Sequence, residues 1–260
     1  MSSLQPLYLR PRTRADLAAG LAAHHGDYAL LAGGQTLVPL LQKNPGKVGA
    51  IIDLRHVEGL SDVHEGDAEV TLGAMVTLAE AQDRLAPIFP SFALALAKTA
   101  NLPVRNWATI GGSLALFDTA SEAWTFLHAY DADMILLGPE GEARRPVALG
   151  AIPPGFALTA IAIGRPSPGE AAGFAEILRR RSGGRALAMG FARSNAGGQV
   201  TVTVSGSGIP PTRLGSFGQI AGKALVDSIS KTGAAPAVRA WLLAAARRAL
   251  ANLTEAQDPS

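Results

Sequence analysis

Apolar residues at helical spacing appear early in the chain. Leu17 and Leu21 share one face of a segment that Thr13 can N-cap, and Asp16 falls in its first turn. Gly26 lies where such a helix would end, because glycine readily adopts the left-handed backbone of a helix C-terminus. The pattern therefore predicts an amphipathic helix between Thr13 and Gly26.

The rest of the first half alternates between strand-like and helical patterns. Short apolar or alternating runs predict strands at 28–33, 49–57, 68–76 and 133–138. Helical spacing predicts helices over 77–100, broken at Pro87 and Pro90, and over 121–132. The sequence Gly-Pro-Glu-Gly at 138–141 predicts a hairpin turn.

A Pro/Gly-rich stretch at 164–173 predicts a domain boundary. Beyond it, strand patterns at 185–194 and 199–208 flank Asn-Ala-Gly-Gly and predict a hairpin. Two helices are expected to close the chain, at roughly 217–229 and 236–252. The second carries an apolar stripe that predicts packing against a core, formed by Trp241, Leu242, Ala245, Ala249 and Leu253.

Composition narrows the possible functions. Of 260 residues, 48% are hydrophobic and 17% are charged, which is typical of a globular protein with a sizeable core. A formal net charge of +2 gives no electrostatic basis for nucleic-acid binding. No apolar run reaches the roughly 18 residues of a membrane span, and the N-terminus lacks a signal core, so a cytoplasmic location is expected.

The chain contains no cysteine, which excludes disulfides, thiolate zinc sites and cysteine-ligated iron–sulfur clusters within it. Its five histidines show no metal-binding spacing, so surface or capping roles are expected for them. No metal site and no acid–base or nucleophilic triad is predicted.

Two glycine pairs interrupt apolar segments after strand-like residues. Residues 33–36 read Gly-Gly-Gln-Thr among leucines that look buried, and residues 111–113 read Gly-Gly-Ser. A backbone without Cβ atoms lets a phosphate approach consecutive N–H groups, so two such loops could hold a pyrophosphate between them. Thr36 and Ser113 would add hydroxyl donors, and Gln35 an amide. Tight turns are the alternative, since turns are rich in glycine.

Four ordered motifs give the chain a resemblance to a known family. They read LAGGQTLVPLL, IIDLRHVEGL, VTLGAMVTLAE and VRNWATIGGSLALFDTASE. Together they closely resemble the FAD-binding middle subunit of molybdenum hydroxylases. The resemblance implies an α+β fold, the FAD-binding fold shared with vanillyl-alcohol oxidase and p-cresol methylhydroxylase. It implies two FAD-binding subdomains, 1–57 and 58–168, and a small α+β C-terminal domain, 169–260.

The resemblance also implies which residues hold the FAD. The first FAD loop matches Ala32, Gly33, Gly34, Gln35 and Thr36, and the second matches Thr109, Ile110, Gly111, Gly112 and Ser113. Asp118 and Glu122 stand at the family's acidic positions, Glu122 near the ribose, with capping of the next helix as the alternative. Leu158 matches the position beside the isoalloxazine ring.

The chain also departs from the family pattern. Leu116 stands where the family often has histidine, and Thr119 where it has proline, so non-covalent FAD is expected. Gly184 and Arg185 replace the family's acidic and aromatic residues. Arg185 would then place a cation near the N1/C2 edge of the flavin, and a solvated basic strand end is the alternative.

The implied function is electron transfer within a larger enzyme. A large subunit would carry the molybdopterin cofactor and a small subunit two [2Fe–2S] clusters, expected together as a dimer of heterotrimers. FAD on this chain would pass electrons to a quinone, a cytochrome, NAD or oxygen. Two alternatives stay open: a self-sufficient flavin oxidase of the same fold, and a scaffold subunit without FAD.

Overall fold

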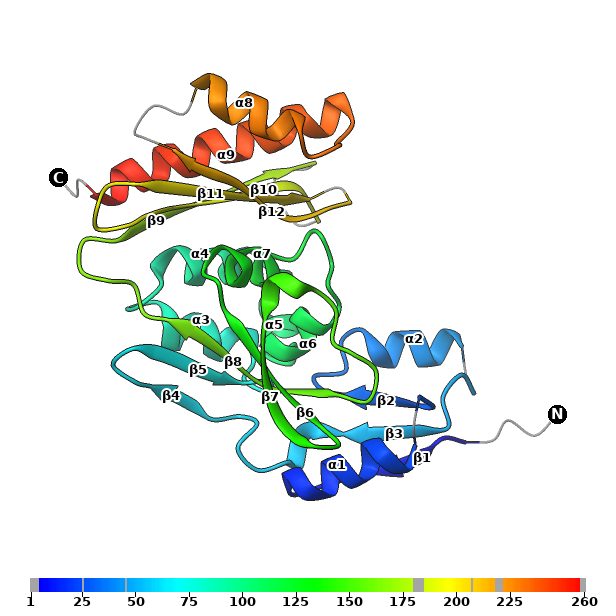
Figure 1. Ribbon diagram of the computed structural model, residues 1–260. Coiled ribbons are helices and arrows are strands. Elements are labelled where there is room, and N and C mark those ends of the chain that lie inside the picture. Colours follow the sequence, from blue (N-terminus) through cyan, green and yellow to red (C-terminus); the bar gives the residue numbers. More distant parts are fainter. Residues whose placement is uncertain are drawn as a thin grey trace.

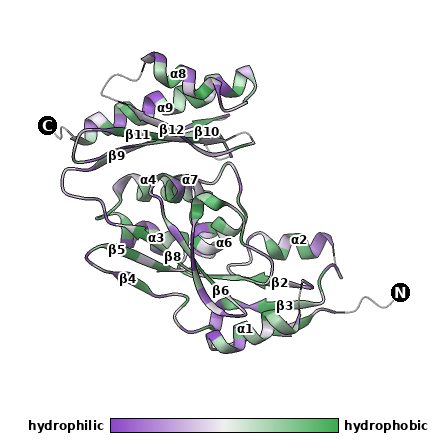
Figure 2. Ribbon diagram, in the orientation of Figure 1, coloured by the Kyte–Doolittle hydropathy of each residue, from purple (hydrophilic) through white to green (hydrophobic). Residues whose placement is uncertain are grey.

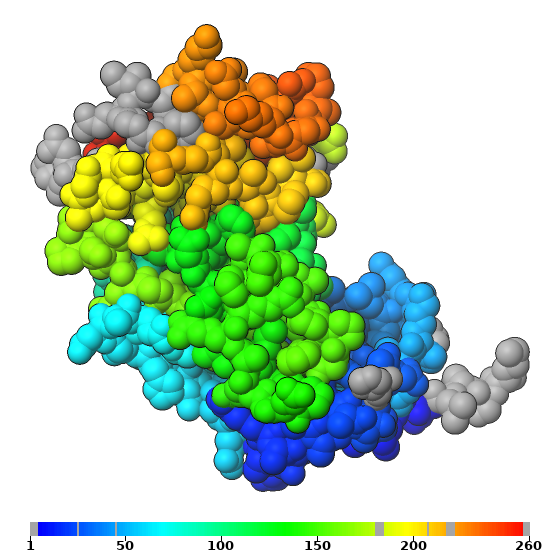
Figure 3. Space-filling model, viewed as in Figure 1, coloured from blue at the N-terminus to red at the C-terminus, as the bar shows by residue number. Residues whose placement is uncertain are grey.

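The computed structural model describes residues 5–24, 26–44, 46–179, 185–206, 208–217 and 222–257. Within these ranges three sheets follow one another in chain order. Figure 1 shows them stacked in the same order, and Figure 3 shows the corresponding parts of the surface, from the blue N-terminal part through the green middle to the yellow and orange C-terminal part. No helix in the described ranges is long and apolar enough to cross a membrane.

The first sheet is small and parallel, with strand order β1-β3-β2. Its strands are β1 (Leu7–Leu9), β2 (Tyr28–Leu31) and β3 (Ala50–Asp53), and its helices are α1 (Arg14–Ala23), α2 (Leu37–Lys43) and the 3₁₀ turn η1 (Leu54–His56). The chain crosses from β1 to β2 and then turns back to β3, so right-handed connections place α1 and α2 on opposite faces (Figure 1). Since β2 and β3 run in parallel, the segments that follow them emerge at one edge.

The second sheet is antiparallel, with strand order β4-β5-β8-β6-β7. Its strands are β4 (Val63–Glu65), β5 (Glu69–Gly73), β6 (Asp133–Gly138), β7 (Gly141–Pro146) and β8 (Ala157–Gly164). Its helices are α3 (Leu78–Leu85), α4 (Pro90–Lys98), α5 (Leu102–Arg105), α6 (Ile110–Ala115), α7 (Glu122–Ala129) and the 3₁₀ turn η2 (Val147–Leu149). In Figure 1, α4 and α7 lie between this sheet and the third.

The third sheet is antiparallel, with strand order β12-β11-β10-β9. Its elements are β9 (Ala171–Leu178), β10 (Ala186–Ser194), β11 (Val200–Gly206), β12 (Ile209–Phe217), α8 (Gly222–Ser230) and α9 (Pro236–Gln257). One face packs on α4 and α7, and the other is covered by α9, whose colours alternate in Figure 2 as expected for an amphipathic helix. Of the predicted stripe, Trp241 is only partly buried and the other four residues are buried.

Most predicted elements are confirmed. Thr13 and Asp16 form a reciprocal capping box on α1, and its apolar face is buried. The break between α3 and α4 falls at the predicted prolines, and both predicted hairpins form. The domain boundaries at 57 and 168 fall in connections between sheets, and the division itself stays a prediction. Residues of β9 and β10 share one hydrophobic cluster with α4 and α7.

Three predictions are wrong. The leucines after the first glycine pair are not buried, because α2 is a short surface helix with Val38 and Leu40 exposed. The segment before the second pair contains α5 rather than a strand, and Thr109 makes an isolated β-bridge to Thr77. The predicted helix over 217–229 begins too early, because Phe217 still belongs to β12. The prolines of β12 are tolerated because it is an edge strand, where a missing N–H costs no ladder bond.

Candidate cofactor site

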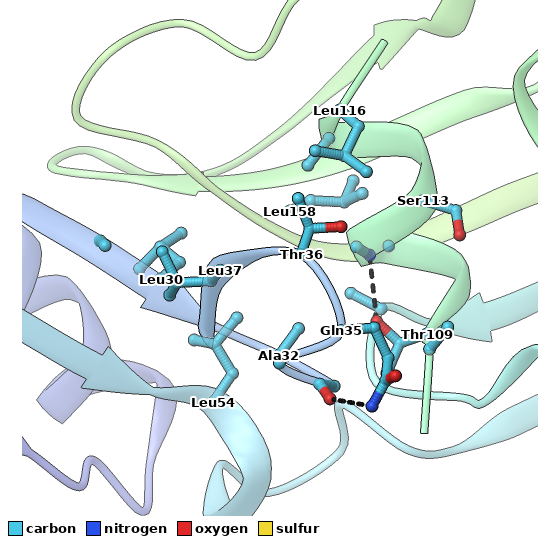
Figure 4. A pocket seen from close by; sticks show the side chains of 18 of the residues that line it. Leu30, Ala32, Gln35, Thr36, Leu37, Leu54, Thr109, Ser113, Leu116 and Leu158 are labelled. Atoms are coloured by element: carbon cyan, nitrogen blue, oxygen red, sulfur yellow. Dashed lines mark hydrogen bonds between the residues drawn. The ribbon is translucent and has the colours of Figure 1, made fainter. Parts of the chain in front are cut away.

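A cavity of about 290 Å³ lies between the first sheet and α6. The segments after β2 and β3 supply one side of it, and α6 and β8 supply the other (Figure 4). Ten of the fourteen predicted site residues line it: Ala32, Gly33, Gly34, Gln35, Thr36, Thr109, Gly111, Gly112, Ser113 and Leu158. The structure therefore brings the two glycine pairs, far apart in sequence, to one cavity.

The first glycine loop has free backbone donors. Gly34 adopts a left-handed backbone, with φ of +72°. The carbonyls of Gly34 and Thr36 accept the first bonds of α2. No acceptor within the described residues is recorded for the backbone N–H groups of 33–36, and the Gln35 amide reaches only the Gly33 carbonyl, at 3.4 Å. Consecutive N–H groups around a left-handed residue form an anion-binding nest.

The second glycine pair is built differently, because it lies in the first turn of α6. Thr109 N-caps that helix, and its hydroxyl and carbonyl accept the N–H groups of Gly112 and Ser113. The N–H groups of Ile110 and Gly111 donate to Val76 and Ala74. All four N–H groups are thus engaged. Of the two loops in the described residues, the first is therefore the one with free N–H groups. This side of the cavity offers hydroxyl groups instead. The Thr109 hydroxyl is engaged with Gly112, and the Ser113 hydroxyl has no hydrogen-bond partner among the described residues.

The first loop touches the backbone of the residues that precede the second loop. A Cβ at Gly33 would stand 1.7 Å from the carbonyl oxygen of Trp107 and 3.1 Å from the Cα of Ala108. Only glycine permits this approach, because any side chain there would push the loops apart. The close approach fixes the first loop against the residues that lead into α6.

The remaining lining is apolar and uncharged. Leu116 and Leu158 lie at one end of the cavity in Figure 4, and Gln35 and Thr109 at the other. No lining residue in the described part of the chain carries an ionisable side chain. The cavity thus pairs a hydrogen-bonding region with an apolar wall, an arrangement suited to a ligand with a phosphate group and a flat ring.

Four predicted site residues lie elsewhere. Ile110 is fully buried in the hydrophobic core. Arg185 is mostly exposed and forms an ion pair with Asp118, while Gly184 lies outside the described residues. Glu122 is buried at the start of α7 and accepts a hydrogen bond from the Thr99 hydroxyl at 3.0 Å. The N-cap of α7 is Ser121, and Glu122 follows it in the first turn, where its carboxylate accepts a hydrogen bond from its own backbone N–H.

Burial, helped by the nearby carboxylates of Glu176 and Asp118, raises the pKa of Glu122 to about 7 against the hydrogen bonds from its own backbone N–H and from Thr99. Because the folded state holds this proton more tightly than the unfolded state, stability falls as the pH rises from about 4.5 to about 7. Glu122→Gln is expected to stabilise the chain by about 2–3 kcal/mol at pH 8 and to have little effect at pH 4.5.

Urea unfolding of both chains at the two pH values measures this difference. Equal gains at pH 4.5 and pH 8 would contradict the titration of Glu122. The same variant tests whether Glu122 contacts the ribose of FAD. Because the Glu122 carboxylate accepts from Thr99, FAD affinity is expected to change little. A large loss of FAD affinity would favour a contact with the ribose.

A buried carboxylate that sequence reasoning missed supports the cavity. Asp53 is fully buried and accepts from the Tyr8 hydroxyl at 2.8 Å and from Arg55 at 2.7 Å. Burial raises the pKa of Asp53, but the hydrogen bonds from Arg55 and Tyr8 outweigh it and lower that pKa to about 2. This network holds η1 at the end of β3, where Leu54 enters the cavity lining. The sequence signal that could have pointed to this network is an acidic residue at the end of an apolar strand.

Comparison with known proteins agrees with this geometry. A family model described as the FAD binding domain in molybdopterin dehydrogenase matches residues 2–152. The chain belongs to this family. It is 30% identical to the 6-hydroxypseudooxynicotine dehydrogenase complex subunit alpha of Paenarthrobacter nicotinovorans, covering 81% of this chain and 75% of that one. It is also 30% identical to the carbon monoxide dehydrogenase medium chain of Afipia carboxidovorans, covering 85% and 80%.

Solved structures confirm the predicted fold class. A chain of carbon monoxide dehydrogenase from Hydrogenophaga pseudoflava superposes with a TM-score of 0.86 at 21% identity, covering 98% of this chain and 99% of that one. Quinoline 2-oxidoreductase from Pseudomonas putida gives a TM-score of 0.80 at 21% identity, covering 99% and 98%. The chain is therefore an FAD-binding medium subunit of the molybdenum hydroxylase type, and thus an oxidoreductase component.

Proposed function

We propose that this chain holds FAD non-covalently in the cavity and transfers electrons from the [2Fe–2S] clusters of a partner subunit to a terminal acceptor. The free N–H groups of residues 33–36 are the observation that carries the proposal, since they are unpartnered donors at a family FAD loop. FAD supplies the two-electron redox chemistry, and the chain supplies its binding and orientation.

Each side of the cavity has a distinct role in this proposal. The nest at 33–36 receives the pyrophosphate, and the hydroxyls of Thr36 and Ser113 donate to it. Leu158 and Leu116 pack against the isoalloxazine ring. No histidine lines the cavity among the described residues, which supports non-covalent binding. Ile110 lies in the hydrophobic core and Glu122 at the start of α7, so neither lines the cavity.

The proposed partners are a molybdopterin-binding large subunit and a [2Fe–2S] small subunit, in a dimer of heterotrimers. The relatives named "complex subunit alpha" and "medium chain" are by name components of larger assemblies. The absence of cysteine in this chain fits a cluster held on another subunit. A cytoplasmic location stays a prediction from the sequence.

Titration of the purified chain with FAD, followed by desalting, tests the proposal. The protein is expected to retain one equivalent of yellow flavin and to release it intact on acid precipitation, because no covalent link forms. Co-expression with the partner genes is expected to yield a complex whose substrate bleaches the flavin.

The same preparation separates the alternatives. Oxidation of an alcohol or amine by the isolated chain would favour the self-sufficient oxidase. Failure to take up FAD, both alone and in the complex, would favour the scaffold and would overturn the proposal.

A further inference from the structure

The first glycine loop has an exposed tryptophan as its neighbour. Trp107 follows α5 and is 61% exposed, and its carbonyl oxygen lies against Gly33. The next two residues, Ala108 and Thr109, line the cavity, whereas Trp107 stands just outside it. Its backbone therefore lies beside the phosphate nest, and its side chain is open to solvent next to the cavity.

The cavity is too small for the whole of FAD. Its volume of about 290 Å³ is at the lower end of the range for a single drug-sized ligand. FAD contains two ring systems joined through a pyrophosphate. If the pyrophosphate rests on residues 33–36, one ring system enters the cavity and the other must extend along the surface beyond the nest.

The two ends of the cavity decide which ring goes where. Leu116 and Leu158 form an apolar wall at one end, which suits the larger isoalloxazine ring (Figure 4). Gln35 and Thr109 lie at the opposite end, and the backbone of Trp107 lies against Gly33 of the nest. The adenine therefore leaves the cavity on the side of Trp107.

We propose that the exposed indole of Trp107 is a stacking platform for the adenine ring of FAD. An indole offers a broad apolar face to a purine, and such stacking needs no hydrogen bond. The inference rests on the proposed function, because it assigns the outer half of the same cofactor. It adds a binding residue outside the two glycine loops.

Calorimetric titration of the full chain with FAD, ADP and FMN tests the proposal. Trp107→Ala is expected to weaken FAD and ADP binding by about 10-fold to 100-fold. FMN, which lacks adenine, is expected to bind as it does to the native chain. Trp107→Phe keeps an aromatic face and is expected to retain most of the FAD affinity.

Leu102→Ala is the matched control, because Leu102 is 55% exposed on the preceding helix α5. It is expected to leave all three affinities unchanged. Unchanged FAD and ADP binding by Trp107→Ala would overturn the inference. It would favour a contact between the exposed indole and a partner subunit instead. An equal loss for FMN would also overturn it, because it would indicate general damage to the cavity. A native chain that binds no FAD would instead refute the proposed function.

Discussion

Replacing Gly34 by valine is expected to lower FAD affinity by about 100-fold or more, because it removes the nest that receives the pyrophosphate. Gly34 has φ of +72°, which a β-branched residue avoids, so the variant loop moves toward an ordinary backbone. The free N–H groups of residues 33–36 then change their positions relative to one another. Flavin absorbance after desalting, followed by a titration for the dissociation constant, measures the loss.

Gly26→Val is the matched control for backbone strain. Gly26 has φ of +80° and lies after α1, with nothing within 4 Å of an added Cβ. Both variants are expected to lose about 1–2 kcal/mol of stability from the left-handed backbone. Gly34→Val alone should turn colourless. If it stays as yellow as Gly26→Val, the first loop does not hold the pyrophosphate.

The second large effect is expected at Phe126, where Phe126→Ala should cost about 3–5 kcal/mol of unfolding free energy. Phe126 is fully buried on α7, stacks on Phe92 of α4 with ring centroids 3.8 Å apart, and meets Phe191 of β10 edge-on at 5.4 Å. The alanine variant leaves a cavity where the second and third sheets share their core. Guanidinium unfolding followed by circular dichroism measures the change.

Phe126→Leu fills most of that space and is expected to cost less than about 2 kcal/mol. Because the aromatic cluster spans both parts, the native chain is expected to unfold in one transition. Two separate transitions in the native chain, with Phe126→Ala shifting only one, would show that the C-terminal domain is independent of this core.

The sequence predicts best where the determinants are local. Thr13 and Asp16 fix the start of α1 by a capping box, and the prolines between α3 and α4 break a helix without help from the rest of the fold. The exposed α2 was misjudged because its leucines resemble a core strand in composition. Their exposure depends on tertiary placement, which no local pattern encodes.

The candidate site shows the same division between what local sequence determines and what tertiary structure determines. Glycine pairs and family motifs predicted ten residues of the cavity lining. They did not predict that Thr109 would accept two of the N–H groups of the second loop, because that depends on α6 beginning there. Nor did they reveal the Asp53 network, whose partner Tyr8 lies 45 residues away in sequence. Long-range pairs of this kind become visible only in three dimensions.

The uncharged lining of the cavity has a consequence for proton movement. A flavin held here as proposed would supply the electron-accepting ring, and a cation beside that ring would favour its reduced form. The lining within the described residues supplies none, and Arg185 is engaged with Asp118. Because an unpaired charge is costly in such apolar surroundings, the proposed electron transfer would be accompanied by uptake of a proton from solvent. Electron flow through the chain would then slow in alkaline solution and in deuterated water.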